Sequence, residues 1–563
     1  MSARSPPSGA GSVRRCVIAA LSLAMATANT RTEEAVCVAN ATIDELRQAL
    51  ASGHTTAEVL VRAYLSRIEA YDQSGLRLNA VRELNPDATA IAASSDAREP
   101  AARRPLEGVP ILVKDNIATG DAQHTTAGSL ALEGARAKDD ATVVKLLRQA
   151  GAVILGKANL TEFANIIAID MPAGYSSLGG QVKNPYAPEL DDKGVPLVPP
   201  GGSSSGSAVA VAAGLAAAAI GTETSGSLLS PASQNGVVTV KPTVGLISRA
   251  GIVPIAQSQD TAGPLTRTVR DAALLLNVLA AADPLDPATG ELRRPADYTR
   301  LLDRDGLKGA RIGVPSDPSD LANDFYYGPL APRAAAVMRG AIDVLEREGA
   351  EVVRANIPTE GWIGGPGTEM AILNRNPESP TKNQPARRPI VFVYELKHDL
   401  NLYLRDWAAG TAIASLADII AFNIDHAHRA LRFGQDILLA AEATRGDLSE
   451  LEYASARQMD LRASRTLGLD AYMDGYRLDA VLFPGAVGAS IAAKAGYPSV
   501  QVPAGFVSGI RDKETPDYPY GATFTGRAWS EAILLRLGYA FEQATQARHP
   551  PPDVPPLGPP CPQ

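Results

Sequence analysis

Cysteine, histidine and aromatic residues are scarce in this sequence. Its 563 residues include 3 cysteines and 6 histidines, and aromatic side chains make up 5%. Neither Cys37 nor Cys561 has a second cysteine or a histidine at metal-ligand spacing, and the histidines form no H-E-x-x-H arrangement. The sequence therefore predicts no metal site and excludes the usual metalloprotease motif.

Dense runs of basic residues are also missing. The formal net charge is -8, so the chain lacks the electrostatic footprint of a protein that binds nucleic acid or an anionic membrane. Its glycine- and serine-rich run is not followed by lysine, which excludes a phosphate-binding P-loop. With 45% hydrophobic and 20% charged residues, the chain can form a large globular core. We expect a small-molecule or peptide substrate and no nucleic-acid partner.

The N-terminal segment has the pattern of a secretory signal peptide. Arg14 and Arg15 precede an apolar run over residues 16–25, and small residues follow as Ala24-Met25-Ala26 and Ala26-Thr27-Ala28. An A-x-A site after a short apolar run is typical of a cleavable leader, and the run is too short to span a bilayer. The alternative is an apolar tail with no export role.

This interpretation divides the chain into three parts. Residues 1–28 form the signal peptide, residues 29–548 a single domain, and residues 549–563 a proline-rich tail expected to lie extended outside the core. The mature protein would be secreted or periplasmic, without a stable membrane span. Cys37 and Cys561 would then be its only cysteines, and both a disulfide between them and two free thiols remain open. The oligomeric state is also open.

Capping patterns predict two helices at the start of the mature chain. Thr42 with Glu45 forms one capping box, and Thr55 with Glu58 forms a second. Each box places a hydroxyl where it can accept a hydrogen bond from a backbone N–H that the first helical turn leaves unpaired.

Short apolar runs further along indicate a buried sheet. Residues 108–113 and 152–155 are apolar, and an amphipathic stretch over residues 141–150 separates them. Apolar runs that alternate with helical stretches predict an α/β protein, with its chemistry in loops at strand ends. Lys114 ends the first run. A lysine buried there would lose its charge and serve as a general base, whereas a surface lysine with its amine in solvent is the alternative.

Two glycine- and serine-rich turns flank one small-residue segment. Residues 208–220 are almost entirely Ala, Val, Leu and Gly, which predicts a closely packed helix leading into a strand. The turns at residues 201–207 and 221–227 lie at the two ends of this buried segment, so the segment connects them.

One hydrolase motif is formally present in the first turn. Residues 202–206 match G-x-S-x-G and centre Ser204 as a candidate elbow nucleophile. The motif requires a preceding strand, but residues 198–201 are turn-like. His426 and His428 are the downstream histidines that could serve as the catalytic base of this motif. The alternative is that both lie on a helix without a catalytic role.

Several segments together resemble the amidase signature family. The resemblance covers nearly the whole mature chain and includes the segments 108–116, 201–214, 221–232, 236–264, 478–484, 495–499, 502–505 and 526–531. It implies an α/β fold with a large mixed β-sheet covered by helices on both faces. It also implies a catalytic triad of Lys114, Ser203 after a cis peptide bond, and Ser227 as the nucleophile. No cofactor is implied.

The same resemblance implies an oxyanion hole before the nucleophile. Backbone N–H groups of Thr224, Ser225 and Gly226, with that of Ser227, would face the developing oxyanion. The family's common form reads Gly-Thr-Asp-Thr-Gly-Gly-Ser-Ile-Arg, and this chain departs from it at Glu223, Ser225, Leu228 and Leu229.

The glutamate for aspartate, the triple serine and the segments 394–400 and 415–419 are similar to a peptide-amidase-like branch. That branch implies removal of the C-terminal amide of peptides, with an acyl-enzyme and release of ammonia. The alternatives are a fatty amide, aryl amide or ester hydrolase with the same triad, the catalytic A component of an amidotransferase, which the predicted export disfavours, and a non-catalytic binding protein.

Overall fold

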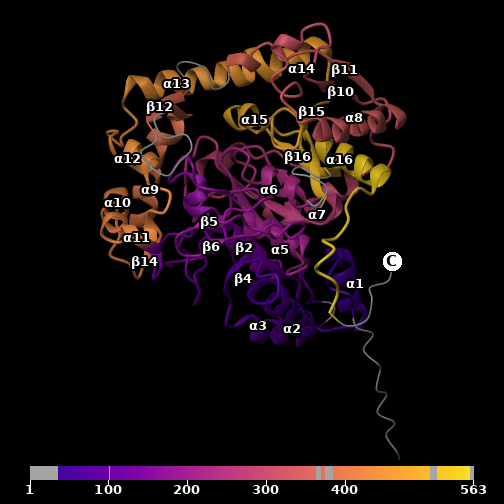
Figure 1. Ribbon diagram of the computed structural model, residues 1–563. Coiled ribbons are helices and arrows are strands. Elements are labelled where there is room, and N and C mark those ends of the chain that lie inside the picture. Colours follow the sequence, from indigo (N-terminus) through magenta and orange to yellow (C-terminus); the bar gives the residue numbers. More distant parts are fainter. Residues whose placement is uncertain (1–35, 100–101, 363–368, 374–384, 508–516, 558–563) are drawn as a thin grey trace, which may run out of the picture. The chain divides into compact units, whose positions relative to one another are not determined.

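An eleven-stranded mixed β-sheet organises the computed structural model (Figure 1). The structure describes residues 36–99, 102–362, 369–373, 385–507 and 517–557, so the predicted leader lies outside the described residues. The sheet strands, in chain order, are β1 (Val81–Leu84), β2 (Pro110–Lys114), β4 (Val153–Ala158), β7 (Ala218–Glu223), β8 (Val238–Lys241), β9 (Thr261–Thr266), β10 (Arg311–Val314), β11 (Glu351–Arg354), β15 (Ala480–Pro484), β16 (Ser499–Val507) and β17 (Tyr518–Thr525). The shorter pairs are β3 (Arg136–Ala137) with β14 (Ala408–Ala409), β5 (Tyr175–Ser176) with β6 (Gly180–Gln181), and β12 (Glu369–Leu373) with β13 (Pro385–Pro389).

The strand order places two distant segments of the chain side by side. The order is β1-β4-β2-β7-β9-β8-β16-β17-β15-β10-β11. Strand β2 pairs in parallel with both β4 and β7, and the ladder with β7 ends at the pair Val113 and Ile220. Strands β8, β9, β16 and β17 pair antiparallel. The carboxyl ends of β2 and β7 are therefore neighbours, and the mixed sheet predicted from the family resemblance is confirmed.

Helices cover the sheet. Every residue of β2, β4, β7, β8, β9 and β15 is buried, and a strand buried at successive residues must be covered on both faces. The α-helices are α1 (Ile43–Ser52), α2 (Ala57–Arg67), α3 (Ala88–Asp96), α4 (Thr142–Gln149), α5 (Ser205–Ala212), α6 (Leu229–Gln234), α7 (Val269–Leu279), α8 (Pro332–Arg347), α9 (Ile390–Asp406), α10 (Leu416–Asp425), α11 (Ala427–Ala430), α12 (Asp436–Glu442), α13 (Leu451–Leu461), α14 (Asp470–Tyr476), α15 (Ala489–Ala495) and α16 (Glu531–Thr545).

The two predicted capping boxes have different outcomes. Thr42 and Glu45 form the reciprocal box at the start of α1, as predicted. The second prediction is wrong by one residue, because the extended residue that caps α2 is Thr56 and not Thr55. The carboxylate of Asp96 accepts the N–H groups of the first two residues of α2. A side chain from α3 therefore accepts the Glu58 N–H, which the sequence pattern assigned to the Thr55 hydroxyl.

The described part of the proline-rich tail packs on the core, contrary to the prediction that it lies outside. Val554 is buried in the main hydrophobic cluster. The guanidinium of buried Arg67 donates hydrogen bonds to the carbonyls of Val554 and Pro555. Proline has no N–H to satisfy, so carbonyl acceptors paired with a buried arginine are sufficient to hold this segment. Cys37 is disulfide-bonded, whereas Cys561 lies outside the described residues.

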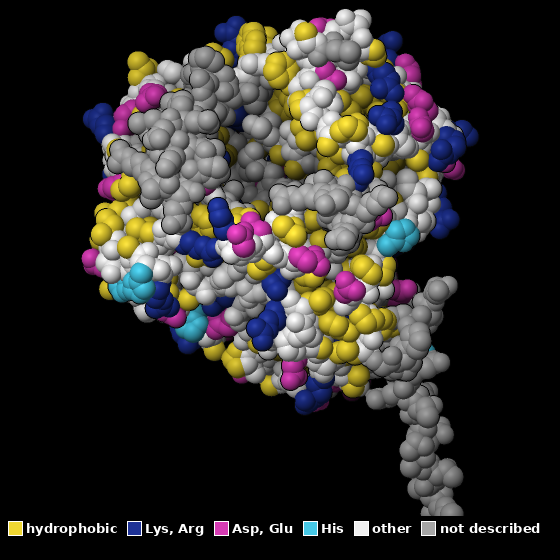
Figure 2. Space-filling model, in the orientation of Figure 1, with side chains coloured by type: hydrophobic (Ala, Val, Ile, Leu, Met, Phe, Trp, Pro, Cys, Tyr) yellow, Lys and Arg dark blue, Asp and Glu magenta, His cyan; other side chains and the backbone are white. Residues whose placement is uncertain are grey.

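Charged side chains of both signs are interspersed on the face shown in Figure 2, where neither sign forms a continuous area among the described residues. In the described part of the chain, no helix is both long enough and apolar enough to cross a membrane.

The close contact of α5 with its neighbours gives a first testable prediction. A Cβ at Gly206 would lie 2.3 Å from the Ala80 carbonyl oxygen and 2.5 Å from that of Asn159. We expect Gly206→Ala to destabilise the fold by about 1–3 kcal/mol or more through overpacking. Exposed Gly340 in α8 has nothing within 4 Å of its Cβ position, so Gly340→Ala should stabilise by about 1 kcal/mol. Thermal unfolding of the two variants checks this, and equal midpoints would contradict it.

Candidate active site

Lys114 lies at the end of β2 with its amine fully buried. Its Nζ is 2.7 Å from Ser203 Oγ, 3.0 Å from Ser204 Oγ and 2.9 Å from Thr222 Oγ1. These three contacts come from the turn before α5 and from the end of β7, the strand beside β2. The structure thus brings Lys114 and Ser203 together, as the sequence predicts, and the surface-lysine alternative is wrong.

Burial lowers the pKa of the Lys114 amine to about 7. A cation that leaves water without a carboxylate in contact loses more solvation than neutral acceptors return, so the uncharged form is favoured. The carboxylates of Glu223 and Asp260 act in the opposite direction and raise this pKa. Near neutral pH, a substantial fraction of Lys114 is therefore an uncharged amine that can accept a proton.

Ser203 is held by its backbone in a closely packed turn. The peptide bond between Gly202 and Ser203 is cis, as the family resemblance implies, and the Ser203 carbonyl accepts a hydrogen bond from the Thr161 N–H at 3.1 Å. A Cβ at Gly202 would lie 2.6 Å from the Thr161 hydroxyl. Ser203 is fully buried, so its hydroxyl faces Lys114 and not solvent.

Ser227 lies on the turn that connects β7 to α6. Its carbonyl accepts a hydrogen bond from the Ser204 N–H at 3.1 Å, which joins the two serine-rich turns. Ser227 is 7% exposed, against 0% for Ser203. The turn is closed by the Glu223 carboxylate, which accepts the N–H groups of Leu228 at 2.7 Å and Leu229 at 3.0 Å. Of the predicted triad members, Ser227 is thus the one that solvent reaches.

The predicted oxyanion donors lie on this same turn. Backbone N–H groups of Thr224, Ser225 and Gly226 make no hydrogen bond within the described residues. Gly226 has a φ of +81°, a conformation that suits glycine and reverses the chain before Ser227. The Thr224 hydroxyl donates to Asp260, and burial raises the pKa of that carboxyl to about 7. The turn is therefore anchored at both ends while its amide groups remain available.

The structure does not bring a histidine to Ser204. His426 Nδ1 contacts the carbonyl of Phe422 at 2.9 Å, and its ring stacks on that phenylalanine. His428 is exposed on α11. Ser204 is instead fully buried. The elbow-nucleophile interpretation is wrong, and the alternative for the two histidines, a helix without a catalytic role, fits the structure.

Three residues of the site were not singled out from the sequence. Thr222 contacts Lys114 directly, Asn116 Nδ2 donates to Thr222 Oγ1 at 3.0 Å, and Asp260 anchors the turn before Ser227. All three lie inside or next to segments that carry the family resemblance. Their contacts arise from the adjacency of β2, β7 and β9, which no local sequence pattern specifies.

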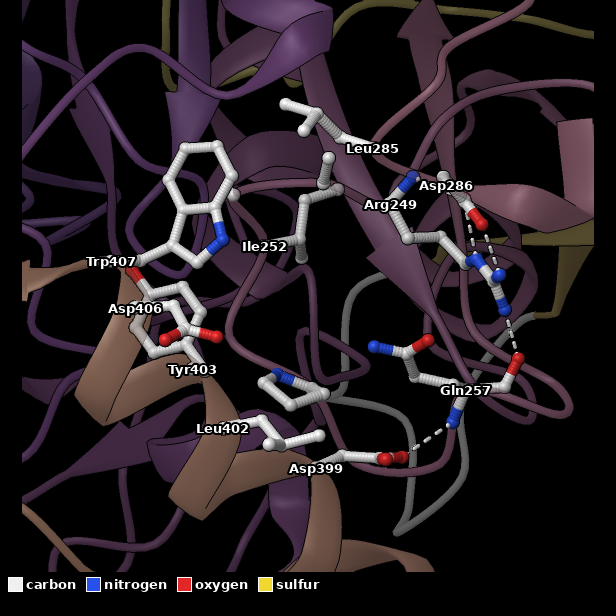
Figure 3. A pocket seen from close by; sticks show the side chains of 13 residues that line it. Arg249, Ile252, Gln257, Leu285, Asp286, Asp399, Leu402, Tyr403, Asp406 and Trp407 are labelled. Atoms are coloured by element: carbon white, nitrogen blue, oxygen red, sulfur yellow. Dashed lines mark hydrogen bonds and ion pairs between the residues drawn. The ribbon is translucent and has the colours of Figure 1, made fainter.

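A cavity of about 430 Å³ is lined by the second half of α9 and by residues from the segment 249–257 (Figure 3). Tyr403 and Trp407 line one side, and Arg249, paired with Asp286 at 2.8 Å, lines the opposite side. A smaller cavity that shares Arg249 with it is lined by Thr222. Neither cavity is lined by Lys114, Ser203 or Ser227, and the smaller one is also lined by Glu223 and Thr224 of the turn that leads to Ser227.

Comparison with known proteins gives consistent matches over most of the chain. The amidase family model matches residues 59–535. A probable amidase of Arabidopsis thaliana is 40% identical over 527 residues, which cover 91% of this chain and 92% of that protein. The structure of the native peptide amidase from Stenotrophomonas maltophilia is 41% identical with a TM-score of 0.78, covering 91% of this chain and 98% of that one. The A component of the glutamyl-tRNA(Gln) amidotransferase of Halorhodospira halophila is 34% identical, covering 90% and 97%.

The buried environment of Lys114 predicts an unusual titration. With lysine labelled at 13Cε, the Lys114 resonance should titrate near pH 7, so that the neutral amine dominates above that pH. Lys157 and Lys241 are also buried, and their pKa values are lowered to about 8. Lys114→Met identifies the resonance by removing it while the other two remain. A Lys114 resonance that titrates near the ordinary value of 10.5 would contradict the effect of burial.

Proposed function

The chain belongs to the amidase family and is an amide-hydrolysing enzyme, and we propose that it works through a Ser-Ser-Lys triad with Ser227 as its nucleophile. The observation that carries the proposal is the 2.7 Å contact between Ser203 Oγ and the buried amine of Lys114. An uncharged amine at this distance accepts the serine proton, the first requirement of a hydroxyl nucleophile without histidine.

The proposed first half-reaction forms an acyl-enzyme. Neutral Lys114 takes the proton of Ser203 as Ser203 takes that of Ser227, and Ser227 Oγ attacks the amide carbonyl carbon. The tetrahedral oxyanion is bound by backbone N–H groups of the turn from Thr224 to Ser227, each donor contributing about 3 kcal/mol to transition-state stabilisation. The proton on Lys114 then returns through Ser203 to the nitrogen, the C–N bond breaks, and ammonia leaves.

The second half-reaction uses the same groups with water. Lys114, neutral again, accepts a proton from water through Ser203 while the water oxygen attacks the ester carbon. Collapse of the second tetrahedral intermediate releases the carboxylic acid and returns the proton to Ser227. The residues present supply every proton transfer, so the proposed cycle uses no metal or cofactor.

C-terminal amides of peptides are the proposed substrates. The support is the 41% identity to the Stenotrophomonas maltophilia peptide amidase across 98% of that chain. The same chemistry would serve a fatty amide, an aryl amide or an ester. The amidotransferase component from Halorhodospira halophila shares 34% identity with this chain, but the proposed export separates this chain from a cytosolic role in such a complex.

The proposal predicts loss of ammonia release in a folded Ser227→Ala protein. Removal of the nucleophile should lower kcat for C-terminally amidated dipeptides by at least about 10³-fold. Ser225→Ala, in the same turn, keeps its backbone N–H and should retain activity within a few-fold. Ammonia release from both variants and wild type, with fatty and aryl amides in parallel, is the measurement.

The outcomes separate mechanism from substrate. Release from peptide amides that is absent in Ser227→Ala supports both parts of the proposal. Release from other amides alone keeps the triad and rejects the peptide substrate. Substantial activity in folded Ser227→Ala rejects Ser227 as the nucleophile.

Export is proposed from the pattern of Arg14, Arg15 and the apolar run that follows. Expression with the native N-terminus should give a protein outside the cytoplasm that begins near Asn29. N-terminal sequencing of the exported material is the measurement, and an intact Met1 would exclude cleavage.

A further inference from the structure

The hydroxyl of Ser204 contacts the Lys114 amine, although Ser204 is not a member of the proposed triad. Its Oγ lies 3.0 Å from the Lys114 amine, and it also binds both backbone groups of Thr222. The ladder between β2 and β7 ends at Ile220. Two residues later, Thr222 still pairs with Ala262 of β9, but its N–H and C=O bind the Ser204 side chain and not β2.

The hydrogen-bonding capacity of Ser204 is fully used. A serine hydroxyl donates one hydrogen bond and accepts two. The Ser204 proton goes to the Thr222 carbonyl oxygen at 3.0 Å, and Ser204 Oγ accepts the Thr222 N–H at 3.2 Å. The remaining position faces Lys114. Ser204 can therefore only accept a hydrogen bond from the lysine, never donate one to it.

A second acceptor beside the amine has the same restriction. The Thr222 carbonyl oxygen lies 3.3 Å from Lys114 Nζ, and a carbonyl cannot donate. A neutral lysine has two N–H groups and one lone pair. When Ser204 Oγ and the Thr222 carbonyl take the two N–H groups, the lone pair is left for Ser203, 2.7 Å away. The Thr222 hydroxyl, 2.9 Å from the amine, can both donate and accept, so it does not fix the orientation by itself.

We propose that Ser204 is a positioning residue, whose hydroxyl holds one N–H of the uncharged Lys114 amine and thereby directs the lone pair at the Ser203 hydroxyl. The proposal rests on the function proposed above, because it explains why the Lys114 amine accepts a proton from Ser203 and does not donate a hydrogen bond to it. Without this fixed acceptor, the amine can rotate and present an N–H to Ser203, which would leave Ser203 unable to give up its proton.

A helix cap is the obvious structural alternative for this serine, and the geometry does not support it. Ser204 is the residue before α5, but its side chain makes no capping hydrogen bond to that helix. The hydroxyl points to β7 and Lys114 instead. A contribution to packing remains, so the test needs a readout that packing alone would not change.

The test compares Ser204→Ala with Ser207→Ala, a matched loss of a buried serine hydroxyl. Ser207 lies on α5, is fully buried and contacts the Ile220 carbonyl at 3.4 Å and not Lys114. We expect Ser204→Ala to lower kcat about 10- to 100-fold at nearly unchanged KM. Loss of an acceptor should also destabilise the charged amine, so the acidic limb of kcat and the Lys114 13Cε titration should both move to lower pH by about one unit. Ser207→Ala should change neither limb.

Ser204→Cys is the second variant, for the case that Ser204→Ala does not fold. A thiol fills the space but is a weak acceptor, so the same downward shift is expected. A folded Ser204 variant with an unchanged Lys114 titration and an unchanged acidic limb overturns the proposal, as does an equal shift in Ser207→Ala. The titration needs no substrate. If wild type hydrolyses no amide, the proposed function fails while a shifted titration still supports the contact between Ser204 and Lys114.

Discussion

The site depends on one constraint, which is that an amine is buried at the end of β2 among groups without full charge. Ser203, Ser204 and Thr222 surround the Lys114 amine with hydroxyl and carbonyl oxygens. A carboxylate in contact would hold the charged form and remove the base, whereas an apolar pocket would leave the N–H groups unpaired. Neutral acceptors meet both requirements. The parallel pairing of β2 with β7 supplies the groups of Thr222, and the turn before α5 supplies the hydroxyls of Ser203 and Ser204.

Two carboxylates link Lys114 to the turn that carries Ser227. Glu223 and Asp260 both raise the pKa of Lys114 and limit the effect of burial. Each is bound elsewhere: Glu223 accepts two backbone N–H groups after Ser227, and Asp260 accepts the Thr224 hydroxyl. The groups that shape the turn therefore also tune the base. A glutamate in place of the family's usual aspartate still has the reach to close this turn.

The sequence predicted those parts of the structure that local patterns specify. Lys114 ends a buried strand as its apolar run indicates, and the small-residue segment forms α5 and β7 between the two serine-rich turns. Contacts set by distant segments were not predictable. Asp96, from another helix, shares the capping of α2 with Thr56, and Arg67 binds the tail through carbonyls almost five hundred residues away. A local capping pattern or a proline-rich composition does not specify partners that are distant in the sequence.

Ser204 illustrates the same limit at the level of one hydroxyl. Three serines near glycine turns look alike in sequence, and G-x-S-x-G even selects the middle one of the first turn. They differ in how many hydrogen-bonding positions are occupied and in exposure. Ser204 has all three occupied and no exposure, Ser203 is buried against Lys114, and Ser227 reaches solvent. A nucleophile needs an accessible oxygen and a proton that a base can remove. The folded chain, and no local pattern, shows that Ser227 is the exposed serine and that the saturated hydroxyl of Ser204 lies in contact with the Lys114 amine.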